Sequence, residues 1–268
     1  MKICVIGAGI IGSAMIKSLL QDKRVKKIIA TDRRVEKLKG LEEIGVKITS
    51  DNKKAAGEAD IVILCVKPRN VKGVLEEIIK EIEGKLIVSV AAAVPLHFLK
   101  EKAPKSRFIR IMPNIAVLVQ EAFIAYCKEA DVTFEDVKQV EKMLNKIGKY
   151  MEVDEKYMDA ITGLSGSGPA YLLVIIEALT YAGLKVGLPR DLAYFSTLQT
   201  VIGTAKLLKE NEKSIQELKD MIVTPGGTTI NGIYELEKGN IRAVIMRTVE
   251  AATKKSEKIK KAIIMGQP

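Results

Sequence analysis

The chain has 268 residues, with 47% hydrophobic residues, 28% charged residues and a net charge of +10 at pH 7. This balance is typical of a folded globular protein and excludes a disordered or fibrous chain. Lysines are mixed with glutamates over residues 135–149 and 250–261, and aromatic residues make up only 4% of the chain, so we expect no nucleic-acid partner.

The cysteines and the hydropathy pattern bear on cellular location. Cys4, Cys65 and Cys127 lie in separate apolar runs, and their odd number and wide spacing predict neither a disulfide framework nor a metal site. We identify no apolar run that approaches the roughly 20 residues of a transmembrane helix. We therefore expect buried free thiols, no bound metal, no membrane partner and a cytoplasmic location.

The first half of the chain alternates apolar, β-rich runs with helical stretches, which is typical of parallel strands covered on both faces. We predict strands at residues 2–6, 27–31, 61–66, 86–90 and 108–111, further strands at 122–127 and 150–153, and a helix at 134–147. Residues 1–153 are therefore predicted to form an α/β domain with a doubly wound, Rossmann-type sheet that binds a dinucleotide.

The second half of the chain contains no further β-rich alternation. Helices are predicted from Pro169 to about Gly183 and from Pro189 to about Leu208, and Pro225-Gly226-Gly227 interrupts the chain before the final helices. Residues 154–268 are therefore predicted to form an all-α domain. Its wide apolar faces predict dimerisation.

A glycine-rich loop, Gly7-Ala8-Gly9-Ile10-Ile11-Gly12, follows the first predicted strand and opens a helix. In such loops the first glycine permits a tight turn, the second lets the backbone approach a pyrophosphate, and the third lets helix and strand pack closely. A glycine turn without a ligand is the alternative, but the surrounding α/β alternation favours a dinucleotide site.

The end of the second predicted strand, Thr31-Asp32-Arg33-Arg34, carries opposing signals for the nucleotide. Asp32 could bind the ribose diol of NAD, whereas Arg33 and Arg34 could hold the 2′-phosphate of NADP. We expect NADPH, because two guanidinium groups can outweigh one carboxylate, with NADH as the alternative.

Two more segments lie where strands end, at the edge of the sheet where ligands bind. Lys67 is either a cofactor-site residue or a surface lysine that ends its strand. Ala91-Ala92-Ala93 would let the nicotinamide half of a cofactor come close, or would simply pack against a helix.

Two segments of the helical half combine glycines with hydroxyl residues ahead of a helix, at residues 159–171 and 223–230. Such loops can present amides and hydroxyls to an anion, although Ser167 could simply cap the following helix. Two loops of this kind favour a pocket for a carboxylate or phosphate. His97 is the single histidine and has no evident partner, which argues against a hydrolase or a metalloenzyme.

Five segments in register resemble the pyrroline-5-carboxylate reductase family over essentially the whole chain, namely residues 7–12, 66–68, 110–114, 159–171 and 224–229. The resemblance implies an NAD(P)H-dependent oxidoreductase that acts on a C=N bond and reduces 1-pyrroline-5-carboxylate to L-proline, the last step of proline biosynthesis. It also implies a homodimer, commonly assembled into a decamer, in which the loop at residues 224–229 reaches the partner subunit's cofactor.

The motifs and the resemblance together give a set of candidate site residues. The cofactor-binding candidates are Gly7, Gly9, Ile10, Ile11, Gly12, Thr31, Arg33, Asn52, Val66, Lys67, Pro68, Ala91 and Ala92. The resemblance implies substrate contacts from Glu155, Thr224, Thr228 and Thr229. Thr229 is the catalytic candidate, with its hydroxyl facing the ring nitrogen, and we expect it to position the substrate because an unassisted threonine is a weak acid.

The chain departs from the family pattern at three places. Asn114-Ile115-Ala116 stands where Asn-Thr-Pro is usual, Ala93 where glycine is common, and Ser214-Ile215 where a His-Pro pair is frequent. Two alternatives remain: another nicotinamide-dependent imine or hydroxyacid oxidoreductase, which would need a catalytic lysine or histidine beside the nicotinamide, and a nucleotide-binding protein without catalysis.

Overall fold

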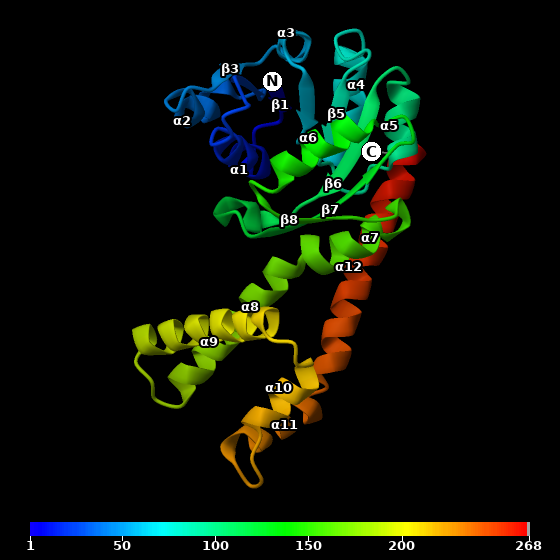
Figure 1. Ribbon diagram of the computed structural model, residues 1–268. Helices are drawn as coiled ribbons and strands as arrows, with labels where there is room; N and C mark the ends of the chain where they lie inside the picture. Colours follow the sequence, from blue (N-terminus) through cyan, green and yellow to red (C-terminus); the bar gives the residue numbers. More distant parts are fainter. Residues whose placement is uncertain (267–268) are drawn as a thin grey trace. The chain divides into compact units, whose positions relative to one another are not determined.

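The computed structural model describes residues 1–266, and the chain divides into two compact units (Figure 1). Unit 1 comprises Met1–Ser167 and Glu250–Pro268, and unit 2 comprises Gly168–Val249. The sequence predicts a domain boundary between residues 153 and 154, whereas the spatial division falls between Ser167 and Gly168.

Within residues 1–266, eight strands of unit 1 form one sheet in the order β3-β2-β1-β4-β5-β6-β7-β8. The strands are β1 (Lys2–Ile6), β2 (Lys27–Thr31), β3 (Lys47–Thr49), β4 (Ile61–Leu64), β5 (Leu86–Ser89), β6 (Arg107–Met112), β7 (Ala122–Lys128) and β8 (Gly148–Glu152). Neighbours among β1 to β6 are parallel, β7 is antiparallel to β6, and β8 is parallel to β7. The order 3-2-1-4-5-6 is that of dinucleotide-binding folds, so the predicted fold class is confirmed.

Helices cover both faces of this sheet. Ile3 and Val5 of β1 belong to one buried cluster with residues of α1 (Ile10–Leu19) and α6 (Phe134–Leu144). Cys4 and Ile6 belong to a second cluster on the other face. That face is covered by α3 (Asn52–Glu58), α4 (Val71–Ile78) and α5 (Leu96–Lys102). Alternate residues of a strand point to opposite faces, so the fully apolar strands supply both cores.

Short helical segments complete unit 1. They are η1 (Val35–Leu38), α2 (Lys39–Glu42), η2 (Pro68–Asn70), η3 (Ile115–Val119), η4 (Glu155–Tyr157), α7 (Met158–Ile161) and the π-helical turn η5 (Thr162–Gly166). In η3 the Ala116 amide donates to the Asn114 side chain at 3.0 Å. A proline at position 116, as in the usual family pattern, would lack this donor.

Residues 154–167 join unit 1 because α7 packs on the second core together with the end of α12 (Ile241–Ile264). Met158 is fully buried, and the Asp159 carboxylate accepts a hydrogen bond from Ser256 Oγ at 2.6 Å and pairs with Lys260. Burial alone would raise the pKa of Asp159, but Lys260 and Ser256 outweigh burial, and the pKa is lowered. The last helix is therefore fastened to the nucleotide-binding fold.

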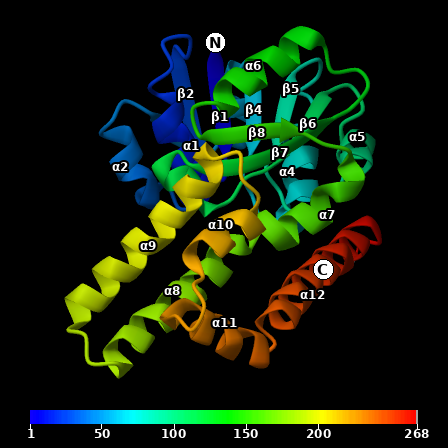
Figure 2. The same cartoon turned by 60° about the horizontal axis from the view of Figure 1, so that its bottom comes forward.

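Unit 2 contains α8 (Gly168–Lys185), α9 (Arg190–Glu210), α10 (Ile215–Ile222), α11 (Thr228–Lys238) and the first part of α12. The predicted helices at 169–183 and 189–208 match α8 and α9, which lie side by side in Figures 1 and 2. A Cβ on Gly183 would lie 2.8 Å from Ala193 Cβ, so glycine allows their close contact. At α10, Ser214 forms a capping box with Glu217 in place of the His-Pro pair.

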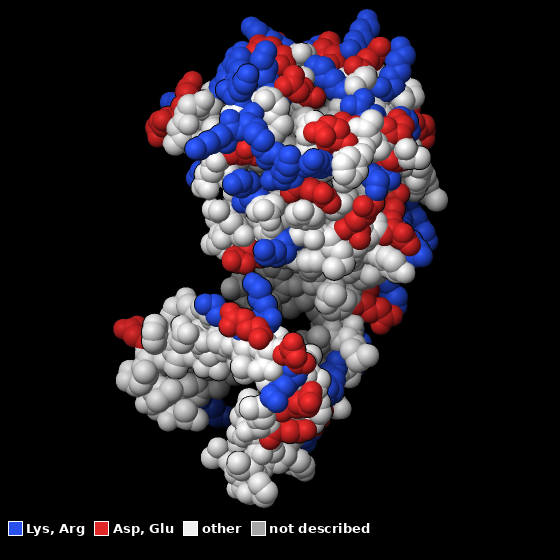
Figure 3. Space-filling model, viewed as in Figure 1, with Lys and Arg blue, Asp and Glu red and all other residues white. Residues whose placement is uncertain are grey.

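The helices of unit 2 expose large apolar side chains: Leu173 is 64% exposed and Phe195 67%. Figure 3 shows the α8–α9 hairpin mostly uncharged on the face in view, whereas Lys, Arg, Asp and Glu are interspersed over unit 1. Contrary to the reading of the sequence, one helical stretch, Glu155–Lys185, is long and apolar enough to cross a membrane by length and composition alone. A helix that packs its apolar side chains against protein can have the same length and composition as a helix that crosses a membrane.

Candidate functional site

A cavity of about 1070 Å³ lies at the carboxyl edge of the sheet in unit 1, where β1, β2 and β4 end. Seven of the predicted cofactor residues line it: Gly7, Gly9, Thr31, Arg33, Asn52, Val66 and Lys67. The structure thus brings together residues that are as far apart in the sequence as Gly7 and Lys67. Open α/β sheets bind dinucleotides at this edge.

The three glycines of the first loop differ in what surrounds them. Gly7 has φ +90°, and a Cβ there would lie 2.8 Å from Val66 Cγ1. A Cβ on Gly12 would lie 2.6 Å from the Gly7 carbonyl oxygen. A Cβ on Gly9 would meet no atom within 4 Å. Packing within the protein therefore requires Gly7 and Gly12, whereas Gly9 leaves open space for a ligand.

Gly9 is also the N-cap of α1, and no side chain among the described residues caps this helix. The first amides of an α-helix lack partners within the helix, so Ile10 and Ile11 add donors next to the open space at Gly9. Positive helix-end charge and free amides suit a pyrophosphate. This cradle fits the dinucleotide that the sequence predicts.

Thr31 and Asn52 form part of the cavity wall and contact each other. The Thr31 hydroxyl donates to Asn52 Oδ1 at 2.6 Å, and Asn52 Nδ2 donates to Glu77 Oε2 at 2.9 Å. The Thr31 carbonyl accepts from the amides of Gly7 and Ala8 at 2.9 and 3.1 Å. These bonds tie the glycine loop to β2, α3 and α4.

The charged residues that follow β2 present two guanidinium groups to the cavity, where they could bind a phosphate. Asp32 Oδ1 accepts a hydrogen bond from the Arg34 amide at 3.0 Å, which occupies one carboxylate oxygen. Arg33 and Arg34 are exposed and line the cavity, and in the described part of the chain neither guanidinium group pairs with a carboxylate. Two guanidinium groups without an anionic partner suit a ribose 2′-phosphate.

Other predicted cofactor residues lie beside the cavity lining. Ile10, Ile11 and Gly12 form the first turn of α1, and Pro68 begins η2 directly after Lys67. Ala91 and Ala92 follow β5 at the same edge of the sheet. Ala93 has φ +59°, in the left-handed region where glycine is favoured, so a glycine at this position would adopt the backbone conformation at lower cost.

The four predicted substrate residues lie in different units. Glu155 is in unit 1, where its Oε1 accepts from the Leu96 amide at 2.7 Å and from Arg110 Nη1 at 2.9 Å. Thr224, Thr228 and Thr229 are in unit 2.

The threonines of unit 2 lie around the start of α11. Gly226 has φ +68°, and a Cβ on Gly227 would lie 2.3 Å from Thr224 Oγ1, so both glycines are required for this turn. Gly227 is the N-cap of α11, and no side chain among residues 1–266 caps the helix. Thr228 and Thr229 therefore stand in a first turn whose amides can receive a carboxylate.

In the first hydroxyl-glycine segment, residues 159–171, two hydroxyl groups have a structural role. The hydroxyls of Thr162 and Ser165 donate to the carbonyls of Met158 and Ile161 at 2.7 and 3.1 Å. A Cβ on Gly166 would lie 2.5 Å from Met112 Cε, so the end of the methionine side chain would have to move to admit it. These two hydroxyls stabilise the π-helical turn, and their donors are occupied.

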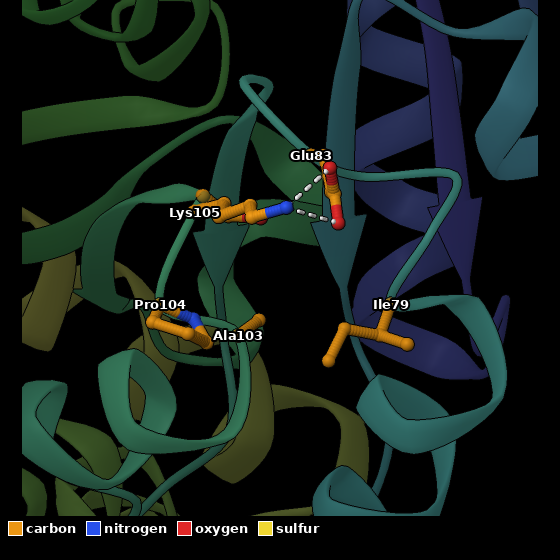
Figure 4. A pocket seen from close by; sticks show the side chains of 6 residues that line it. Ile79, Glu83, Ala103, Pro104 and Lys105 are labelled. Atoms are coloured by element: carbon orange, nitrogen blue, oxygen red, sulfur yellow. Dashed lines mark hydrogen bonds and ion pairs between the residues drawn. The ribbon is translucent and has the colours of Figure 1, made fainter.

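A smaller cavity of about 120 Å³ lies at the opposite edge of the sheet, between Ile79, Glu83 and residues 103–106 (Figure 4). Lys105 Nζ donates to both Glu83 oxygens at 3.1 Å across its mouth. The strands β5 and β6 begin here, away from the carboxyl edge. The larger cavity is the candidate site.

Sequence reasoning missed two residues of this unit. Glu77 holds Asn52, and its place on α4 gave no local signal. Arg110 is 2% exposed within β6, and its position inside an apolar run was a signal that it is paired.

Comparisons with known proteins agree with this geometry. A family model described as "NADP oxidoreductase coenzyme F420-dependent" matches residues 2–93, and one described as "Pyrroline-5-carboxylate reductase dimerisation" matches residues 155–259. A pyrroline-5-carboxylate reductase of Arabidopsis thaliana is 43% identical over 81% of this chain and 79% of its own length. That of Methanosarcina acetivorans is 39% identical over 97% of this chain and 98% of its own length.

Solved structures give the same result. The pyrroline carboxylate reductase of Plasmodium falciparum with NADP bound superposes with a TM-score of 0.90 at 33% identity, covering 97% of this chain and 98% of that one. The pyrroline-5-carboxylate reductase of Coxiella burnetii gives 0.88 at 32% identity, covering 96% and 97%. The chain therefore belongs to the pyrroline-5-carboxylate reductase family and carries that family's dimerisation domain.

Proposed function

We propose that this chain is an NADPH-dependent pyrroline-5-carboxylate reductase that converts 1-pyrroline-5-carboxylate to L-proline. The observation that carries the proposal is the cavity at the glycine loop, lined by Arg33 and Arg34, in a chain 43% identical to a protein of that name. NADH is the alternative cofactor.

The residues of unit 1 would hold the cofactor at both ends of the cavity. The space at Gly9 and the amides of Ile10 and Ile11 would receive the pyrophosphate, and Arg33 with Arg34 would receive the 2′-phosphate. When bound, NADPH supplies the hydride for the imine carbon. The protein must orient the substrate and provide the proton that the ring nitrogen takes up.

In the proposed dimer, the start of α11 of one protomer would bind the carboxylate of a substrate that lies at the partner's cofactor. Thr224 and Thr228 flank the glycine turn, and the helix end favours a negative charge. Thr229 would place its hydroxyl at the ring nitrogen and keep the imine in line for hydride transfer. Holding reactants in geometry for reaction supplies a large part of the rate enhancement of many enzymes.

Assembly and location are further parts of the proposal. We infer a homodimer formed through the apolar faces of α8 and α9, assembled further into a decamer, without nucleic-acid or membrane partners. Cys4, Cys65 and Cys127 are free, and burial raises the pKa of each thiol to about 12. Free thiols of this kind are typical of a reducing compartment, which supports a cytoplasmic location.

The test is direct measurement of turnover. Purified protein should accelerate NADPH oxidation, followed by absorbance, when 1-pyrroline-5-carboxylate is added, and L-proline should form in equal amount. Folded protein that binds NADPH but shows no turnover with either nicotinamide would contradict the proposal. Reduction of 2-oxo acids in place of the imine would instead favour a hydroxyacid oxidoreductase.

A further inference from the structure

A buried arginine and a glutamate connect the sheet to the segment that follows β5. Arg110 is 2% exposed, and its Nη1 donates to Glu155 Oε1 at 2.9 Å. The same oxygen accepts the Leu96 amide at 2.7 Å. Leu96 is the first residue of α5, and Pro95, the N-cap of that helix, makes no side-chain cap. A carboxylate from a distant part of the chain therefore caps α5.

This cap holds one end of residues 91–95. At the other end the Val90 amide donates to the Leu64 carbonyl at 2.9 Å, which continues the β4–β5 pairing. Between these two anchors lie Ala91 and Ala92, the predicted neighbours of the nicotinamide, and Ala93 with its left-handed φ of +59°. The backbone of this segment is thus fixed at both ends.

The arrangement is poorly explained by stability alone. In the described part of the chain, Arg110 Nη2 is buried without a hydrogen-bond partner. A buried donor left unpaired costs free energy, and buried ion pairs can often be replaced by apolar side chains without loss of stability. An apolar residue at position 110 would avoid the unpaired donor, so the guanidinium group points to a role in positioning.

We propose that Arg110 and Glu155 are positioning residues for hydride transfer: through Leu96 they fix residues 91–95, on which the nicotinamide half of NADPH lies. This inference rests on the proposed function. It assigns Glu155 to the protein's own backbone and places it outside the substrate contacts that family resemblance implies. A displacement of the segment by about 1 Å would lower the rate of the chemical step by up to about 100-fold.

Two double variants isolate this role from the effect of an unpaired buried charge. Arg110→Met/Glu155→Gln keeps a side-chain oxygen for the Leu96 amide, and Arg110→Met/Glu155→Ala removes it. Both lack the two charges and differ only in the side chain at position 155, where glutamine alone carries an acceptor oxygen. We expect kcat of the alanine variant to be about tenfold or more below that of the glutamine variant. KM for 1-pyrroline-5-carboxylate should stay within about twofold, because substrate contacts are unchanged.

Arg107→Met/Asp136→Asn, which also removes both charges of its pair, is the matched control. Arg107 is the first residue of the same strand and forms a comparable pair, with Nε to Oδ2 at 2.7 Å, but with Asp136 of α6, away from Leu96 and residues 91–95. This double substitution should lower the melting temperature and leave kcat unchanged. If kcat fell in the same proportion to the loss of melting temperature in all three variants, the positioning role would be overturned.

Hydrogen exchange gives a readout that does not depend on turnover. The Leu96 amide should exchange at least tenfold faster in the alanine variant than in the glutamine variant. Equal exchange, equal kcat, or a rise in KM for the substrate with unchanged kcat would each overturn the proposal. If the wild-type chain reduces no imine, the proposed function fails, while the exchange experiment still shows whether Glu155 anchors Leu96.

Discussion

The Thr31 hydroxyl donates a 2.6 Å hydrogen bond to Asn52 Oδ1, which joins the last residue of β2 to the first residue of α3 in the cavity wall. Thr31→Val keeps the shape of the side chain and removes this donor. We expect a loss of about 1–2 kcal/mol in the free energy of unfolding, measured by urea denaturation, and a higher KM for NADPH. A stable variant with unchanged KM would show that the bond has no part in shaping the cavity.

Gly9 and Gly12 provide a matched pair of substitutions in one loop. Gly12→Ala would place a Cβ 2.6 Å from the Gly7 carbonyl oxygen, so we expect a destabilisation of about 1–3 kcal/mol. Gly9→Ala meets open space and should fold nearly as well as wild type, but should weaken NADPH binding by about tenfold or more because the Cβ occupies the ligand's space. Melting temperature and NADPH titration separate the two effects. Equal NADPH affinity in Gly9→Ala and wild type would remove the pyrophosphate from this position.

The guanidinium groups of Arg33 and Arg34 should determine cofactor preference. For Arg33→Ala/Arg34→Ala we expect Kd for NADPH to rise about 10- to 100-fold, as for the loss of charge-assisted hydrogen bonds worth about 1.5–3 kcal/mol. Kd for NADH should change by less than about threefold, because NADH lacks the 2′-phosphate. Arg24→Ala is the control, since Arg24 pairs with Asp22 and lies outside the cavity lining. Equal losses for both nucleotides would place the 2′-phosphate elsewhere.

The buried carboxylate of Asp159 should contribute to stability in a pH-dependent way. Its pKa in the folded protein is lowered below the ordinary value of 3.8, because Lys260 and Ser256 outweigh the cost of burial. Its contribution is therefore fully present above pH 3.8 and decreases as the pH falls through the folded-state pKa. Asp159→Asn should flatten the pH dependence of the unfolding free energy below pH 3.8. An unchanged slope in acid would show that Asp159 titrates alike in the folded and unfolded chains.

The exposed apolar surface of unit 2 should be covered by a second copy of the chain. Phe195 on α9 is 67% exposed in the single chain, and Phe195→Glu would place a charge in that interface. We expect light scattering after gel filtration to show a smaller species than wild type. Lys138→Glu on α6 in unit 1 is the control and should leave the mass unchanged. An assembled Phe195→Glu protein would place the interface on another face.

Local chemistry explains which parts of the fold could be predicted from the sequence. The apolar runs of β1, β2, β4 and β5 and the glycine loop were recognisable because a few consecutive residues define them. In contrast, β3 has three residues, lies at the edge of the sheet and begins with Lys47, so it carries no apolar run. The spacing of glycines and hydroxyls also did not distinguish the open turn before α11 from the internal hydrogen bonds of residues 162–165.

Long-range contacts explain most of what the sequence did not reveal. The Asn52 side chain donates a hydrogen bond to Glu77, 25 residues away, and the Leu96 amide donates one to Glu155, 59 residues away. Local periodicity contains no information on such pairings. The return of α12 to the first unit was missed for the same reason, since Asp159 and Ser256 are 97 residues apart.

This return of α12 has a consequence for synthesis of the chain. Ile263 of α12 is partly buried and packs against the second core of the nucleotide-binding unit, and Ser256 of α12 donates to Asp159 of α7, so these contacts form only when almost all of residues 1–266 have been translated. Domains that are contiguous in sequence can fold in order as they emerge, whereas this unit gains these contacts only with its last helix. A nascent chain halted before Ser256 should therefore leave an apolar strip at α7 uncovered and depend on chaperones until translation resumes.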